Sequence, residues 1–361
     1  MDLICVCIMV KNEIGTIEKT MNSVIDYTNQ FVILDTGSED GTIQCIKDIC
    51  KKNNKNLKID TVAFIDFSHN RNISLKMCYG LSKYIILLDA NDQCMRMEKL
   101  IKYLKEKEKD KSEKNTFLTK YVLENDNNIV GNTKTFHKCK VIKNDVKEIY
   151  FKCPVHEYLI FPKDKQDRNF SSCGFYIYQN KLKDKPSNQR NEWDKKVLKK
   201  YIIKNKDDDC ALHHFCQTLQ ILGLYDELEI YGKRLVNLMK KRIKDIDKVF
   251  SVSYFTGLLY LGRARFYKGK DFEECFLKAY NHCLSMFENA EVYYEMAQMF
   301  YKREDTEKSK KYIKLCCDIE YKGYPDVLTF NENIYNYFRW NLLDHLFGLD
   351  EVQKYLIKYK K

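Results

Sequence analysis

Proline, glycine and paired cysteines are scarce in this chain. It has four prolines and thirteen glycines among 361 residues, which argues against long disordered tracts. Its fifteen cysteines include no Cys-x-x-Cys pair, so neither a zinc site nor a disulfide framework is indicated. Several cysteines fall in apolar runs, which predicts buried, reduced thiols in a cytoplasmic protein.

Long hydrophobic runs are missing as well. The apolar run at residues 3–10 is short and follows no basic leader, so we expect neither an export signal nor a membrane span. The net charge is +11, with 62 basic and 51 acidic residues intermixed. This balance predicts a solvated, lysine-rich surface that favours anionic ligands such as nucleotide phosphates, and no nucleic-acid partner.

The stretch that organises the first half of the chain is residues 84–92, Tyr-Ile-Ile-Leu-Leu-Asp-Ala-Asn-Asp. Apolar residues in series, without alternation, are typical of a strand buried on both faces of its sheet. Acidic groups at the end of such a strand lie where open α/β folds bind ligands. Asp89, Asn91 and Asp92 could hold a divalent cation that neutralises a diphosphate, although an ordinary Asp/Asn turn has the same residues.

The preceding residues alternate between strands and helices. Strands are predicted at 3–10, 31–35 and 58–65, with helices after each of them, which indicates a mainly parallel sheet with helices on both faces. The glycine-bearing turn at 36–42 offers backbone N–H groups and a helix start to a nucleotide. It is neither a P-loop nor a Gly-x-Gly-x-x-Gly motif. Later strands are predicted at 116–123, 133–142, 158–161 and 173–178.

Four short motifs in this order resemble family 2 glycosyltransferases with the GT-A fold. They are Val10-Lys11-Asn12-Glu13, Asp35-Thr36-Gly37-Ser38-x-Asp40-Gly41-Thr42, Phe67-Ser68-x-x-Arg71-Asn72 and Leu88-Asp89-Ala90-Asn91-Asp92. The layout is most similar to the branch with a helical-repeat tail, which includes sublancin-type peptide glycosyltransferases. Val155-His156-Glu157 matches a further signature of that branch.

The resemblance implies a role for each matching position. The donor, a nucleotide sugar and in particular a UDP-sugar, would contact Val10, Lys11, Asn12, Glu13, Asp35, Gly37, Ser38, Arg71, Asp89, Ala90 and Asn91. Asp89, Asn91 and His156 would hold Mn²⁺ or Mg²⁺. Glu157 is the first candidate for the base of an inverting transfer, and Asp92 is the second.

One position departs from the family pattern. The third residue of the D-x-D element is normally aspartate, and here it is Asn91, whose neutral amide is a weaker metal ligand than a carboxylate. This departure keeps open the alternative of a catalytically degenerate domain that acts as a scaffold through its repeats. A second alternative is a nucleotidyltransferase, which shares the nucleotide-binding layout and releases pyrophosphate.

The rest of the chain predicts a second, all-helical domain. We expect a catalytic domain at 1–180, a linker at 181–189 and tetratricopeptide-like repeats at 190–361. Gly262 and Ala297 occupy equivalent positions 35 residues apart, close to the tetratricopeptide period. The helices at 331–346 and 350–358 would cap the stack. The repeats could bind an acceptor protein, peptide or glycan, form a homodimer, or only stabilise the protein.

Overall fold

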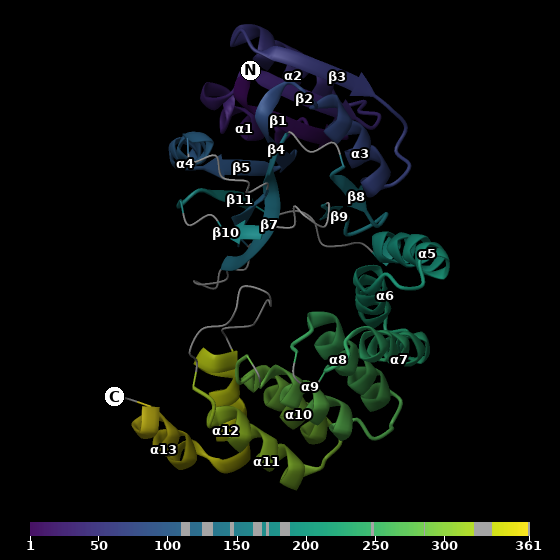
Figure 1. Cartoon of the computed structure of the whole chain (residues 1–361). Coiled ribbons are helices and arrows are strands. Elements are labelled where there is room, and N and C mark those ends of the chain that lie inside the picture. The colour runs from purple at the N-terminus through teal and green to yellow at the C-terminus, as the bar shows by residue number, and fades with distance from the viewer. Residues whose placement is uncertain are drawn as a thin grey trace. The chain divides into compact units, whose positions relative to one another are not determined.

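The chain forms two compact units, residues 1–185 (unit 1) and 186–361 (unit 2) (Figure 1). The structure is a computed structural model that describes all residues except 110–115, 125–132, 145–147, 162–167, 171–172, 181–187, 247–248, 285, 321–333 and 360–361. Among the described residues, no helix combines the length and the apolar character that crossing a bilayer requires.

Unit 1 is built on a nine-stranded mixed sheet with the order β3-β2-β1-β4-β7-β6-β11-β5, and β10 pairs with β6. Five of its strand pairs are parallel and three are antiparallel. The strands are β1 (Asp2–Val10), β2 (Gln30–Asp35), β3 (Asn56–Thr61), β4 (Ser82–Asp89), β5 (Asp92–Met95), β6 (Thr116–Glu124), β7 (Thr133–Lys143), β10 (Arg168–Phe170) and β11 (Tyr176–Asn180). A separate hairpin pairs β8 (Tyr150–Lys152) with β9 (Tyr158–Ile160).

The helices of unit 1 cover both faces of the sheet (Figure 1). They are α1 (Ile17–Asn22), α2 (Thr42–Lys52), α3 (Phe67–Met77) and α4 (Met97–Lys109), with a short 3₁₀ turn at Ile25–Tyr27. Successive residues of β1 point to opposite faces. Ile4, Val6 and Ile8 pack in the core under α1, α2 and α4, while Cys5 and Cys7 pack in the core under α3 and the β8–β9 hairpin. This two-sided burial explains the unbroken apolar runs of β1 and β4.

The carboxyl ends of β1, β2 and β4 stop at the same level. In the parallel registers, Val10 pairs with Asp35 of β2, and its neighbour Met9 pairs with Asp89 of β4. The last residues of β2 and β4 therefore flank the end of β1. Because adjacent strands lie about 4.8 Å apart, the two aspartates start roughly 10 Å from each other along one edge of the sheet.

Asn72 joins α3 to the β8–β9 hairpin. Its Nδ2 donates to the carbonyl of Phe151 over 2.9 Å, and its Oδ1 accepts from the backbone N–H of Phe151 over 2.7 Å. A second bond runs from the N–H of Phe67 to the carbonyl of Pro154 over 3.1 Å. The hairpin carries Glu157, so this joint sets where that carboxylate lies.

The predicted fold class is confirmed, with local differences. The third strand ends at Thr61 rather than at residue 65, and the last strand begins at Tyr176 rather than at 173. Residues 188 and 189, predicted as linker, already belong to a helix, and the other residues of that predicted linker, 181–187, lie outside the described residues. β5, β8 and β10 were not predicted, because strands of three or four residues with polar content do not differ in sequence from turns.

Unit 2 is all helical and tetratricopeptide-like. It consists of α5 (Asn188–Lys204), α6 (Asp209–Ile221), α7 (Tyr225–Arg242), α8 (Val252–Tyr267), α9 (Glu273–Cys283), α10 (Ala290–Lys302), α11 (Thr306–Cys317), a π-helical segment (Ile334–Phe338), α12 (Arg339–Phe347) and α13 (Leu349–Tyr359). Side-chain oxygens of Asp208, Ser251, Asn289 and Asp305 cap the N-termini of α6, α8, α10 and α11.

The two small residues of the repeat lie where one helix crosses the next. Gly262 of α8 faces Phe276 of α9, and a Cβ at Gly262 would lie 2.6 Å from that ring. Ala297 of α10 is fully buried, and its carbonyl accepts a 2.9 Å bond from the hydroxyl of Ser309 in α11. The spacing of 35 residues thus reflects two equivalent close helix crossings.

Replacing Asn72 with alanine should loosen the joint between α3 and the hairpin. Two hydrogen bonds to Phe151 are lost, which costs about 1–3 kcal/mol of local stability. Hydrogen exchange of residues 149–161 should accelerate accordingly. Asn22→Ala, at an exposed position of α1, is the matched control and should leave that exchange unchanged. Equal exchange in both variants would refute the assigned role of Asn72.

Gly262→Ala should destabilise unit 2 although alanine is the better helix former. Helix propensity favours alanine by about 1 kcal/mol, but the added methyl group meets the Phe276 ring and overpacking costs about 1–3 kcal/mol. Both tryptophans, Trp193 and Trp340, lie in unit 2, so urea unfolding followed by their fluorescence measures this unit. In a Phe276→Leu background, Gly262→Ala should lower the free energy of unfolding by less than it does in the wild type. An equal loss in both backgrounds would contradict a clash between the new methyl group and the Phe276 ring.

Candidate functional site

Two loops at the sheet edge are tied together by side-chain bonds. The backbone N–H of Asn12 donates to the hydroxyl of Ser38 over 3.0 Å, and the N–H of Glu39 donates to Oδ1 of Asn12 over 2.8 Å. The N–H of Glu13 donates to the hydroxyl of Thr42 over 2.8 Å. The predicted donor residues after β1 and after β2 therefore form one continuous rim.

Asp35 ends β2 inside this rim. Its side chain is buried, and its Oδ1 accepts the N–H of Ser38 over 3.0 Å across a turn whose Gly37 has a φ of +98°. A left-handed φ is readily available to glycine, which explains that residue at this place. The turn holds the carboxylate of Asp35 at the edge of the sheet, while Lys11 is exposed on the neighbouring loop.

Arg71 is the centre of the charged part of the site. Its Nη2 lies 2.6 Å from Oδ1 of Asp89, and its Nε lies 2.5 Å from Oε1 of Glu157. One guanidinium from α3 thus joins the end of β4 to the segment before β9. All three side chains are mostly buried, with 14%, 29% and 16% of their surfaces exposed, respectively.

Lys140 of β7 supplies a second cation to the same place. Its Nζ lies 3.2 Å from Oδ2 of Asp89 and 3.4 Å from Oδ2 of Asp92. The Asp92 side chain is completely buried, and its Oδ2 also accepts the N–H of Asp89 over 2.9 Å. Gln179 of β11 donates to Oδ1 of Asn91 over 2.7 Å and to Oδ1 of Asp92 over 3.2 Å.

These charges shift the ionisation of the groups that carry them. Burial alone would raise the pKa of Asp89, but Lys140, Arg71 and Lys138 outweigh burial and hold its pKa below the ordinary value. Burial would likewise lower the pKa of Lys140, and the carboxylates of Asp89 and Asp92 raise it instead. Ion pairing therefore keeps Asp89 and Lys140 charged at neutral pH.

Two predicted donor-binding residues also serve the fold through their carbonyls. The carbonyl of Val10 accepts from both the N–H and the hydroxyl of Thr36, over 2.9 Å and 3.1 Å. The carbonyl of Ala90 accepts the hydroxyl of Thr20 over 2.7 Å. A nucleotide at these positions would thus contact other groups of Val10 and Ala90, or would share their carbonyls with Thr36 and Thr20.

Glu157 and His156 lie beside each other but differ in surroundings. The Glu157 carboxylate is mostly buried against Arg71, whereas His156 is exposed and has a left-handed φ of 55°. Such a backbone conformation is uncommon outside glycine and concentrates at functional sites. The structure brings Glu157 into the cluster with Asp89.

A divalent metal does not fit this arrangement well. Asp89 already pairs its two oxygens with Arg71 and Lys140, and the amide oxygen of Asn91 accepts from Gln179. Among the described residues, no three histidine, cysteine, aspartate or glutamate side chains cluster as ligands of a metal ion. The predicted set of Asp89, Asn91 and His156 would need Lys140 to move before a second cation could approach Asp89.

Sequence reasoning missed Lys140 and Gln179. Lys140 lies in a strand at residues 133–143 with several other lysines, so nothing in the pattern separates it from surface residues. Gln179 lies at the end of a short strand. Only strand pairing places them, because β7 runs antiparallel to β4 and β11 runs antiparallel to β5.

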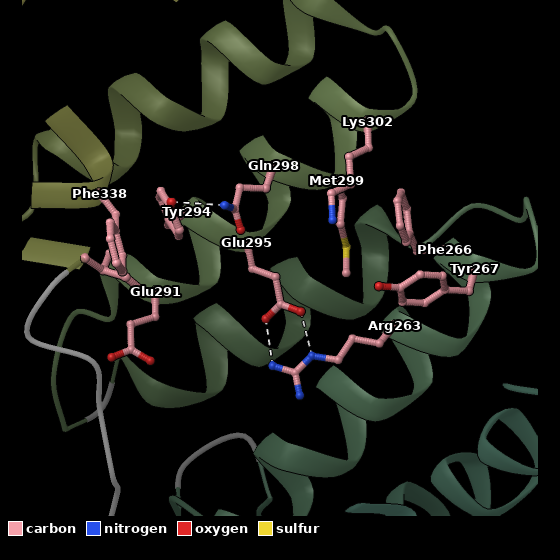
Figure 2. A pocket seen from close by; sticks show the side chains of 11 residues that line it. Arg263, Phe266, Tyr267, Glu291, Tyr294, Glu295, Gln298, Met299, Lys302 and Phe338 are labelled. Carbon is pink, nitrogen blue, oxygen red and sulfur yellow. Dashed lines mark hydrogen bonds and ion pairs between the residues drawn. The ribbon is translucent and has the colours of Figure 1, made fainter. Parts of the chain in front are cut away.

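Unit 2 contains a pocket of about 630 Å³ in its helical stack. Figure 2 shows the carboxylate of Glu295 bonded to the guanidinium of Arg263, with distances of 2.5 Å and 2.7 Å. The amide of Gln298 donates to the hydroxyl of Tyr294 over 2.9 Å beside them. Aromatic rings, including Phe266, Tyr267 and Phe338, form other parts of the wall.

Solved structures that resemble this chain in fold share little sequence identity with it. The TarS protein of S. aureus, residues 1–349 in complex with UDP-GlcNAc, is 13% identical, with a TM-score of 0.45 over 84% of this chain and 92% of that one. A putative kinesin light chain from Podosopora anserina with TPR-like repeats is 11% identical, with a TM-score of 0.36 over 47% of this chain and 86% of that one. Scores this low say nothing about substrate or partner.

The sequence comparison is more specific. No curated protein matches the chain significantly. Residues 5–117, however, match the family described as glycosyl transferase family 2, and this segment contains most of β1 and the elements up to α4, with the rim and the Arg71–Asp89 pair. The segment that carries the rim and the Arg71–Asp89 pair is therefore the part of this chain that matches glycosyl transferase family 2, and a tetratricopeptide-like helical region lies beyond it.

Proposed function

We propose that the protein transfers a sugar from a nucleotide sugar, in particular a UDP-sugar, to a hydroxyl or thiol of an acceptor. The observation that carries this proposal is the common edge of β1, β2 and β4. Asp35 lies at one side of it, and Asp89 lies at the other side beside Arg71. A nucleoside next to Asp35 would direct its diphosphate toward the guanidinium, which binds phosphate oxygens well.

The proposed reaction is an inverting displacement. The acceptor oxygen or sulfur forms a bond to the anomeric carbon, the bond from that carbon to the diphosphate breaks, and the nucleoside diphosphate leaves with its electron pair. Glu157 takes the acceptor proton. Arg71 stabilises the negative charge that develops on the leaving diphosphate.

Arg71 would couple these events. In the structure it holds Glu157 and Asp89 at once. A diphosphate that binds the guanidinium would compete with both carboxylates, and release of Glu157 would make its oxygen available to a proton. Asp92, the second candidate base, has a completely buried side chain bonded to Lys140, so Glu157 is the better placed of the two.

The remaining parts of the proposal concern partner and location. Support for acceptor binding by unit 2 comes from its pocket, where aromatic rings and paired charges such as Arg263 and Glu295 could hold a peptide or a glycan. The fifteen cysteines are present as reduced thiols, which suits a cytoplasmic location. A homodimer through the repeats stays a prediction that gel filtration can test.

Purified protein should release UDP from a UDP-sugar, at least by slow hydrolysis when no acceptor is present. Asp89→Ala should abolish the release, because Arg71 and Lys140 lose their shared partner. A coupled assay for UDP over a panel of UDP-sugars measures this outcome. Release of pyrophosphate from nucleoside triphosphates would favour a nucleotidyltransferase instead, and binding of donor without any turnover would favour a degenerate scaffold.

Glu157→Gln should slow the transfer by about 10²–10⁴-fold, while UDP affinity should not fall, because the change removes a charged competitor for Arg71. Glutamine keeps the size of the side chain but cannot accept the acceptor proton as a carboxylate does. Glu148→Gln, at an exposed position before β8, is the control with the same charge change and should be neutral. Unchanged turnover in Glu157→Gln would remove this residue from the role of base.

A further inference from the structure

Lys140 brings a positive charge to the place where the family pattern expects a metal. It is a buried residue of β7, 6% exposed, and its ammonium lies between the carboxylates of Asp89 and Asp92. Burying a lysine is costly unless its charge is compensated, and two carboxylates compensate this one. Its position is thus set by the same acidic groups that would otherwise bind a cation.

The oxygens that would be ligands already face protein donors. Oδ1 of Asp89 faces Arg71 and Oδ2 faces Lys140. Oδ2 of Asp92 accepts the N–H of Asp89, and Gln179 donates to Oδ1 of Asp92 and to Oδ1 of Asn91. Magnesium and similar ions need about six oxygen ligands in open geometry. This cluster offers them an environment that is already bonded and cationic.

A charge count leads to the same conclusion. Asparagine in place of aspartate at position 91 removes one negative charge from the D-x-D element, and Lys140 adds one positive charge beside it. Together these changes equal the charge of one divalent ion. Lys140 and Arg71 therefore balance the charges of Asp89 and Asp92 from within the protein, and an anionic ligand would reach Arg71 by displacing one of its carboxylate partners.

We propose that Lys140 replaces the divalent cation of the donor site, so that the nucleoside diphosphate binds without metal. Lys140 acts here as a positioning residue, because its side chain is only 8% exposed, against 29% for that of Asp89. It offsets one of the two negative charges of Asp89 and Asp92, and Arg71 makes the contact with the diphosphate. This inference rests on the proposed function and specifies how that site handles its substrate's charge.

Calorimetric titration with UDP tests the inference on the full chain. The affinity of the wild-type protein for UDP should differ by less than about tenfold between excess EDTA and excess Mn²⁺. Tenfold or greater strengthening by Mn²⁺ would overturn the inference and leave the proposed function intact. No UDP binding under either condition would overturn both.

Lys140→Met separates a charge role from a merely structural one. Without the ammonium, the acidic groups Asp89 and Asp92 lose one of the cations that offset their charge, so UDP binding should weaken at least about tenfold in EDTA and recover in Mn²⁺. Direct Mn²⁺ binding, seen as loss of the free-ion signal in electron paramagnetic resonance, should appear in the variant and be absent from wild type. Lys120→Met, exposed on the adjacent strand β6, is the matched control and should behave as wild type.

A second variant keeps the test decisive if Lys140→Met does not fold. Asn91→Asp retains an acceptor for Gln179 and restores the carboxylate that the family pattern has. It should bind Mn²⁺ and make UDP binding responsive to it. If Lys140→Met and Asn91→Asp both bind UDP with the wild-type affinity, and Mn²⁺ does not change that affinity, Lys140 does not replace the metal.

Discussion

The ion pairs of Arg71 are the interaction on which the site depends. One guanidinium on α3 binds Asp89, 18 residues away, and Glu157, 86 residues away. These bonds require α3, the end of β4 and the segment before β9 to be placed together. Asn72, the next residue of α3, fixes the hairpin through Phe151. Two adjacent residues of α3 therefore position the site: Arg71 pairs with its carboxylates, and Asn72 anchors the hairpin.

Charge balance explains why so many polar groups are buried here. Asp92 is completely buried and Lys140 nearly so, which is stable only when each charge has a close partner. The consequence is a site whose groups are bonded to one another before any ligand arrives. An anionic ligand must then exchange partners with Asp89 or Glu157, and such an exchange links donor binding to the state of the candidate base.

Unit 2 depends on another constraint, the close approach of paired helices. The Phe276 ring leaves no room for a Cβ at Gly262, and the buried Ala297 occupies the equivalent crossing. Between successive pairs, Arg263 of α8 and Glu295 of α10 form a two-point ion pair at the pocket. Small residues thus set the repeat, and charged residues join its copies.

Local sequence determined much of this protein. The apolar runs identify β1, β2 and β4 because both faces of those strands are buried, and the small residues 35 apart identify the repeat because helix crossings need them. The polar ends of the strands predict Asp35 and Asp89 at one edge, since parallel strands end together. Tertiary structure alone decided that Lys140 and Gln179 belong to the site. Their strands pair antiparallel with β4 and β5, which lie far away in the sequence. The pattern of residues within a strand does not show which distant carboxylate its lysine will pair with.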